Sequence, residues 1–173
     1  MSNMLGSWRQ LDSKDIPFKF LAFCNAYLDS AERLCKVLKR STRKATYERG
    51  AVVLYLTFHS VELFFKACIL HKRPDERFHH DIKHYEKRYR NIYPGKKYKI
   101  EIPFGTEYSG QEPPDIEQLG WVTPPQEQLH RYPVDKHGKE WNVIPAFEPT
   151  LFLIEIERLK KDICRVKAEI FNS

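Results

Sequence analysis

Residues 59–70, HSVELFFKACIL, are the most informative stretch of this chain for its architecture. Their polar members His59, Glu62 and Lys66 stand three and four positions apart, so they share one face of an otherwise apolar helix. A helix that is apolar over most of its circumference packs against neighbours on several sides. We therefore predict a central helix over about residues 45–71, ended by Pro74. Its two apolar stripes are Val52, Leu56, Leu63 and Leu70 on one line, and Leu54, Phe58, Val61, Phe65 and Cys68 on the other.

The polar face of this helix has two interpretations. Burying ionisable side chains costs free energy unless they are paired. Glu62 and Lys66 are four residues apart, so they can pair within the helix. We interpret them first as an internal salt bridge that orients the neighbouring helices, and a functional polar site with His59 stays open as the alternative.

Three further helices are expected around the central one. Apolar residues recur at every third or fourth position over residues 17–40 and again over residues 149–170, and a shorter helix is expected over residues 80–92. The three stripes are Leu21, Cys24, Leu28, Ala31, Cys35 and Leu38; Phe152, Ile156, Leu159, Ile163, Val166 and Ile170; and Ile82, Tyr85, Tyr89 and Ile92. The fold class is therefore mainly α, an antiparallel up-down helical bundle. Residues 1–15 form a polar lead-in, and residues 16–173 form a single helical domain.

Residues 93–146 differ in kind from the helices around them. They hold 8 of the 11 prolines and 5 of the 7 glycines. Residues 98–103 alternate like a short strand, and residues 131–134 and 139–143 flank the turn-forming residues 135–138. We predict a Pro/Gly-rich loop and β-hairpin insertion before the last helix.

Charge is unevenly distributed along the chain, whose formal net charge is +6. Residues 1–99 carry 21 Lys and Arg against 10 Asp and Glu, whereas residues 100–146 carry 3 against 8. The basic front half can attract a polyanion such as RNA, and a merely solvated basic face is the other interpretation. The candidates for phosphate contact are Arg40, Arg43, Lys44 and Arg73.

The cysteines and the apolar runs indicate a cytoplasmic protein. No CxxC pair or zinc spacing is present, so buried free thiols in a reducing compartment are expected at Cys24, Cys35, Cys68 and Cys164. The first residues contain no apolar signal-peptide core, and the longest apolar run, residues 51–56, is too short to span a membrane.

Several of these motifs resemble the HEPN superfamily. The run of residues 59–70, a loop and His80-Asp-Ile82 are similar to its (H/A)-x-x-E-x-x-x-K-A helix, loop and His-Asp-Leu step. Arg131-Tyr-Pro133 resembles the RYP step before the last helix, so the resemblance covers about residues 45–92 and 129–135. It implies a HEPN-like bundle that forms a two-fold homodimer, with Trp121, Tyr132 and Trp141 as candidate interface anchors.

The resemblance also implies an activity. Many HEPN proteins are metal-independent ribonucleases, which suggests an endoribonuclease of a toxin–antitoxin or phage-defence system, with RNA and an antitoxin protein as partners and no cofactor. Their signature is Arg, four to six residues, then His: His moves the proton of the ribose 2′-hydroxyl and Arg stabilises the charged phosphate. Arg131 and His137 are the pair that we single out, because Arg131 lies in the RYP step. The spacing also fits Arg73 with His79 or His80, and Arg77 with His84.

The second loop supplies the runner-up site, His80 with the adjacent Asp81. His80 and His84 lie one helical turn apart, but no third ligand is near, so no metal site is predicted. Asp81 is equally suited to cap the third helix. The alternative to an RNA-binding enzyme is a non-catalytic helical dimerisation or protein-interaction module.

Overall fold

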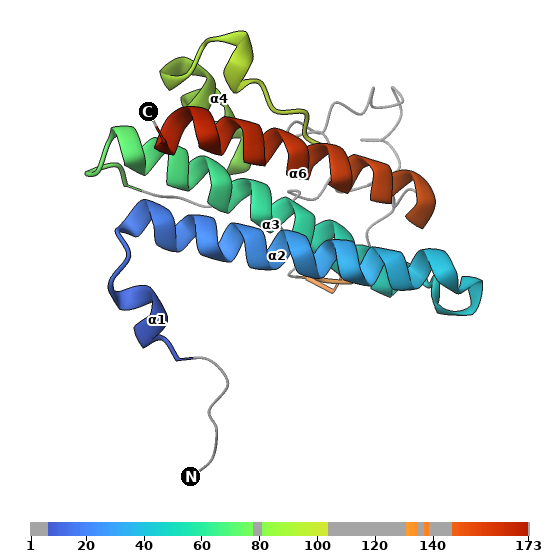
Figure 1. Ribbon diagram of the computed structural model, residues 1–173. Helices are drawn as coiled ribbons and strands as arrows, with labels where there is room; N and C mark the ends of the chain where they lie inside the picture. Colours follow the sequence, from blue (N-terminus) through green and yellow to red (C-terminus); the bar gives the residue numbers. More distant parts are fainter. Residues whose placement is uncertain (1–6, 78–80, 104–130, 135–136, 139–146, 173) are drawn as a thin grey trace.

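The computed structural model describes residues 7–77, 81–103, 131–134, 137–138 and 147–172. Its helices are α1 (Arg9–Asp12), α2 (Ile16–Arg40), α3 (Tyr47–Lys72), α4 (Ile82–Ile92) and α6 (Pro149–Phe171), and its 3-10 turns are η1 (Thr42–Lys44) and η2 (Lys96–Tyr98). α2 runs antiparallel to both α3 and α6 (Figure 1). The prediction of a mainly helical bundle is confirmed.

α3 is the central helix, as its sequence predicts. It packs against α2, α4 and α6, and every residue from 60 to 70 is buried. Among the described residues it is the one helix that is long and apolar enough to cross a membrane, but 72% of its most apolar window is buried inside the bundle, which is compatible with a soluble protein. The predicted stripe is wrong at Val52, whose side chain is 45% exposed, because the neighbouring Val53 turns toward the core.

The flanking helices bury almost all of the apolar residues that their sequence spacing predicts to be buried. All six predicted residues of α2 are buried, and on α6 Leu153 is buried while Phe152 is half-buried against the core. Both helices carry proline in their first turn, where its missing N–H costs nothing. The carboxylate of Glu148 accepts hydrogen bonds from the backbone N–H groups of Thr150 and Leu151, which caps α6.

The polar lead-in contains the short helix α1, which is held to α2 by contact of the Trp8 and Phe23 rings, whose centres lie 6.2 Å apart. One smaller prediction is wrong. Cys164 is exposed, because it lies on the outer side of α6, whereas Ile163 and Val166 on either side of it in the sequence are buried. The other three cysteines are buried free thiols.

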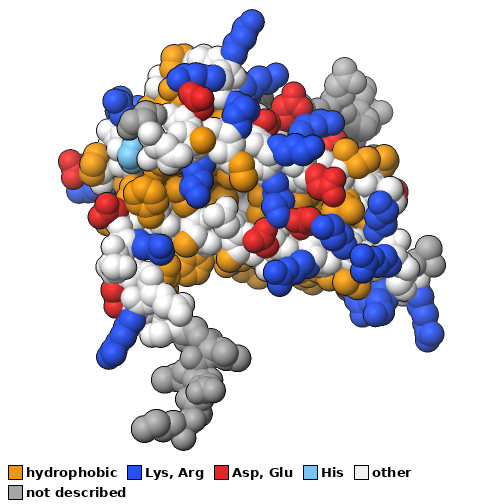
Figure 2. Space-filling model, in the orientation of Figure 1, with side chains coloured by type: hydrophobic (Ala, Val, Ile, Leu, Met, Phe, Trp, Pro, Cys, Tyr) orange, Lys and Arg blue, Asp and Glu red, His pale blue; other side chains and the backbone are white. Residues whose placement is uncertain are grey.

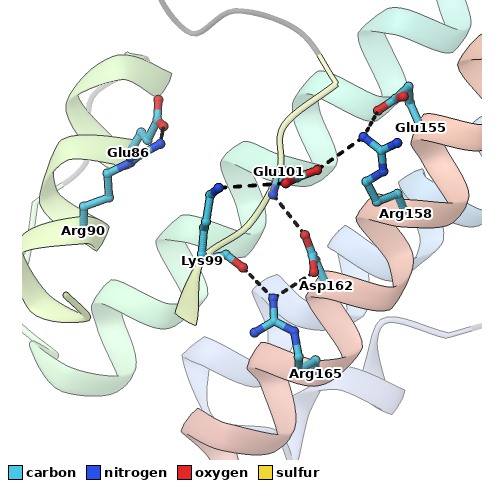
Figure 3. A network of polar contacts seen from close by, with 8 residues as sticks. All are labelled: Glu86, Arg90, Lys99, Glu101, Glu155, Arg158, Asp162 and Arg165. Atoms are coloured by element: carbon cyan, nitrogen blue, oxygen red, sulfur yellow. Dashed lines mark hydrogen bonds and ion pairs between the residues drawn. The ribbon is translucent and has the colours of Figure 1, made fainter. Parts of the chain in front are cut away.

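The predicted strand over residues 98–103 is also wrong: the chain forms the turn η2 and then an irregular segment. Side chains of α6 supply the hydrogen bonds that a neighbouring strand would give. Arg165 donates to the carbonyl oxygen of Lys99, and Asp162 accepts from the backbone N–H of Glu101 at 3.0 Å (Figure 3). Arg165 also donates to the carbonyl oxygen of Lys97. This clamp attaches the segment after α4 to the outside of the bundle.

The structure describes only residues 131–134 and 137–138 of the predicted β-hairpin. Val134 forms a β-bridge, and Gly138 has φ +79°, in the left-handed region that turns require and that glycine adopts easily. The rest of the hairpin, together with Trp121 and Trp141, lies outside the described residues, so the hairpin stays a prediction.

Candidate functional site

The polar face of α3 contains a buried ion pair. Nζ of Lys66 lies 2.5 Å from Oε1 of Glu62, and both side chains are 7% exposed. Burial alone would raise the pKa of Glu62, but its hydrogen bonds with His59 and Lys66 outweigh this effect and lower the pKa to about 2. Lys66 also lies over the ring of Tyr85 from α4, at 5.0 Å from its centre. The predicted pairing within the helix is therefore confirmed.

His59 extends this face toward the surface. Its Nδ1 lies 3.4 Å from Oε2 of Glu62, but its side chain is 24% exposed, so the polar face is buried only at Glu62 and Lys66. The imidazole is parallel to the ring of Tyr55, within 7° and with ring centres 5.8 Å apart. Tyr27 of α2 meets the imidazole edge-on at 4.7 Å. His59 thus lies at the boundary between the buried part of α3 and the protein surface.

Arg131, from a distant part of the chain, contacts Tyr55, the tyrosine that also stacks on His59. Its guanidinium carbon lies 5.7 Å from the ring centre of Tyr55 and 5.5 Å from that of Tyr132. The side chain is exposed, and no carboxylate among the described residues pairs with it. Tyr55 therefore has both Arg131 and His59 as neighbours.

The two halves of the predicted catalytic pair are not brought into contact by any interaction between described residues. Arg131 and His137 are both exposed, and Arg131 instead contacts the two tyrosines. His80 of the runner-up site lies outside the described residues. Asp81 caps α4 by accepting a hydrogen bond from the backbone N–H of His84 at 3.1 Å, which is the structural role open to it from the sequence.

The candidate phosphate contacts fall in two places. Arg40, Arg43 and Lys44 are exposed around the turn between α2 and α3, where Figure 2 shows lysine and arginine side chains gathered at one end of the molecule. Arg73 is exposed at the other end of α3. The described residues contain no group of three or more His, Cys, Asp or Glu side chains that could hold a metal ion.

Sequence reasoning missed the aromatic part of this site. Tyr27 and Tyr55 belong to two helices, and neither stands in a motif with His59 or Arg131. The one available signal was that Tyr55 precedes His59 by four residues, which places both on one side of a helix. The contact of Tyr55 with Arg131, 76 residues further along the chain, depends on how the insertion returns to the bundle.

Comparison of the chain with protein-family models, with characterised proteins and with solved structures gives no match. The helical bundle is a finding of the structure, and the HEPN resemblance stays a prediction.

Proposed function

We propose that this chain is a HEPN-like RNA-binding protein that cleaves RNA without a metal ion, as an endoribonuclease of a toxin–antitoxin or phage-defence system. The observation that carries the proposal is the position of Arg131. Its exposed guanidinium lies over Tyr55 and Tyr132 and pairs with no described carboxylate. A guanidinium binds phosphate through two parallel hydrogen bonds, and bases stack on tyrosine rings. A single RNA strand presents both phosphates and bases at short intervals.

Two further features support RNA as the ligand. The basic turn between α2 and α3 adds Arg40, Arg43 and Lys44, which suit a phosphate backbone. The Arg-to-His spacing from Arg131 to His137 matches the family's ribonuclease signature. The biological system and the cleavage chemistry rest on that resemblance.

Binding is tested by fluorescence anisotropy of a labelled single-stranded RNA in buffer with EDTA. We expect Arg131→Ala to weaken binding roughly tenfold or more, because the substitution removes a phosphate-binding group and part of the neighbouring stacking surface. Arg9→Ala is the matched control, since Arg9 is exposed on α1, outside the site. Equal affinities of the wild type and Arg131→Ala would contradict the proposed interface.

Cleavage is tested by incubating the pure protein with total RNA and EDTA. Specific fragments that end in 2′,3′-cyclic phosphate are expected, because the ribose 2′-hydroxyl is the nucleophile in this chemistry. Binding without cleavage would leave an RNA-binding protein and remove the endoribonuclease.

A non-catalytic dimerisation or interaction module is the second candidate, and one observation favours it. Trp8 is 67% exposed and Phe23 38% exposed where they meet at α1 and α2, and such rings are typical anchors of protein interfaces. Under either function we expect a homodimer, which sedimentation at micromolar protein detects. A strict monomer would contradict the expected dimer.

A further inference from the structure

A cavity of about 330 Å³ lies between α4, the segment that follows α4 and Phe65 of α3. A row of four aromatic rings runs through its lining. The ring centres of Phe65 and Tyr89 lie 4.9 Å apart. Those of Tyr89 and Tyr93 lie 5.4 Å apart, and those of Tyr93 and Tyr98 lie 5.2 Å apart. A cavity of this size holds a small organic molecule, and aromatic walls are typical of such sites.

The polar ends of two of these tyrosines are occupied by the protein itself. The hydroxyl of Tyr89 donates to the carbonyl oxygen of Tyr98 at 2.6 Å, and the hydroxyl of Tyr93 donates to that of Cys68 at 3.0 Å. Burial raises the pKa of Tyr93 to about 12 and also raises the pKa of Tyr89, so both hydroxyls keep their protons at neutral pH. Their rings, rather than their hydroxyls, are therefore available to a ligand. The segment opposite α4 is held by the clamp from α6, so both walls are attached to the bundle.

The charges around the cavity are mostly positive. Its described lining contains Arg90, Lys96 and Lys99, against the carboxylate of Glu86. Arg90 pairs with Glu86 on α4, and Nζ of Lys99 lies 3.9 Å from Oε1 of Glu101 on the neighbouring segment (Figure 3). Lys96 is exposed, and its ammonium group forms no hydrogen bond or ion pair with a described residue. One cation is thus uncommitted, and Glu86 would repel a second negative charge on a ligand, so the cavity suits a monoanion.

We propose that this cavity binds a small aromatic carboxylate, with its planar ring against the tyrosines and its carboxylate on Lys96. Aromatic rings pack on one another in offset and edge-to-face geometries, which the exposed parts of the row of rings offer to a further ring. The ammonium group of Lys96 donates charge-assisted hydrogen bonds to a carboxylate. The site goes beyond the proposed function, since none of its residues belongs to the site around Arg131 and no RNA is needed to fill it.

Binding of 2-naphthoate to the full chain, measured by isothermal titration calorimetry, tests the proposal. Two matched probes separate the ring from the charge: 2-naphthamide keeps the rings without the charge, and cyclohexanecarboxylate keeps the charge without an aromatic ring. Lys96→Gln removes the cation and keeps most of the side-chain length. Lys87→Gln is the control, because Lys87 is exposed on α4 but does not line the cavity. Circular dichroism checks the folding of both variants, and amide shifts of the 15N-labelled wild type locate the bound probe without any substitution.

We expect 2-naphthoate to bind the wild type with a dissociation constant below about 1 mM and to shift the amides of residues 95–100. Affinity should fall about fivefold for 2-naphthamide and about tenfold for cyclohexanecarboxylate. Lys96→Gln should weaken 2-naphthoate about fivefold and leave 2-naphthamide unchanged, since the amide has no charge for Lys96 to pair with. Lys87→Gln should bind all three probes as the wild type does.

The other outcomes overturn the proposal in different ways. Equal affinities for 2-naphthoate and 2-naphthamide would make the cavity an apolar site without selectivity for an anion. Binding of 2-naphthyl phosphate more than about threefold tighter than that of 2-naphthoate would assign the cavity to a phosphate dianion instead. Amide shifts confined to other parts of the chain, or no binding of 2-naphthoate at millimolar concentration, would mean that the cavity does not take this class of ligand. None of these results bears on RNA binding, so the proposed function is tested separately.

Discussion

Glu62 is a carboxylate inside an apolar core, and its cost is offset by two neighbours on its own helix. Lys66 follows it by four residues and His59 precedes it by three, so the spacing alone brings the three together once the helix forms. The burial of Glu62 and Lys66, in contrast, depends on α2, α4 and α6. Two predictions concern the effect of the Glu62 carboxylate on stability.

Removing the carboxylate should destabilise the protein strongly. We expect Glu62→Ala to lower the free energy of unfolding by roughly 3 kcal/mol, because Lys66 is left charged, buried and without its carboxylate. The double variant Glu62→Leu, Lys66→Met is the control and should unfold close to the wild type, since it removes both charges. Urea denaturation measures both; a loss under about 0.5 kcal/mol for Glu62→Ala would mean that the pair contributes little.

The same carboxylate should make stability depend on pH in the acidic range. Its pKa is about 2 in the folded protein against an ordinary value of 4.5, so its stabilising contribution is present above pH 4.5 and is lost as the pH falls toward 2. We expect the wild type to lose stability over this window more steeply than Glu62→Gln. The other carboxylates are common to both proteins and cancel in the difference. Parallel pH curves of unfolding free energy would contradict the lowered pKa.

At the scale of the element, α3 closely approaches Phe147, a described residue just before α6, at Gly50. Gly50 is buried in the first turns of α3, and the ring of Phe147 lies directly over it. A Cβ at residue 50 would come within 2.6 Å of Cγ and 2.8 Å of Cβ of Phe147. These atoms are at the base of the side chain, so rotating the ring does not remove the overlap.

We therefore expect Gly50→Ala to destabilise the protein by about 1–3 kcal/mol, because the overlap forces the helix and the segment apart. In an open helix the same substitution would stabilise by about 0.5–1 kcal/mol, so even the sign of the effect is informative. Gly95→Ala is the control: its Cβ would lie 3.5 Å from Tyr98, an ordinary contact, and its φ of −74° suits alanine. Thermal unfolding of both variants measures the change in stability. A stabilised Gly50→Ala would show that Phe147 does not pack on α3.

At the scale of the whole molecule, the proposed binding of RNA would use only some of the many cations. Lysine and arginine cover much of the face in Figure 2, but several are already paired, as Lys160 is with Asp29 and Glu32. Surface pairs of this kind contribute little to stability. They do lower the number of cations available to a polyanion, so net charge alone does not identify the binding face.

The dependence of RNA affinity on salt separates contacting cations from solvated ones. For single strands the slope of log K against log salt changes by about 0.7 for each phosphate-binding cation that is removed. We expect Arg131→Ala to reduce the slope by about that amount, and the triple variant Arg40→Ala, Arg43→Ala, Lys44→Ala to reduce it by about 2 if the basic turn binds RNA. Anisotropy titrations over a range of salt concentrations measure it. An unchanged slope in the triple variant would make the basic turn a solvated face.

The helices and their buried faces are encoded locally in the sequence. The six buried residues of α2 and the pairing of Glu62 with Lys66 follow from a repeat of 3.6 residues, which is a property of a single helix. Caps and prolines placed the helix ends within one or two residues for the same local reason. Where a prediction needed a partner it failed: the stretch over residues 98–103 alternates like a strand, yet it takes its hydrogen bonds from Arg165 and Asp162 of α6.

The membership of the candidate site, in contrast, depends on the tertiary structure. Arg131, Tyr55, Tyr27 and His59 come from three separate parts of the chain, and no periodicity relates a residue of the insertion to a residue of α3. The same holds for which half of the polar face opens to solvent: spacing placed His59 beside Glu62, but its exposure depends on how far the neighbouring helices cover α3. Local patterns encode the elements, because each element satisfies its own backbone. The contacts between elements depend on side-chain shapes that meet only after the chain has folded.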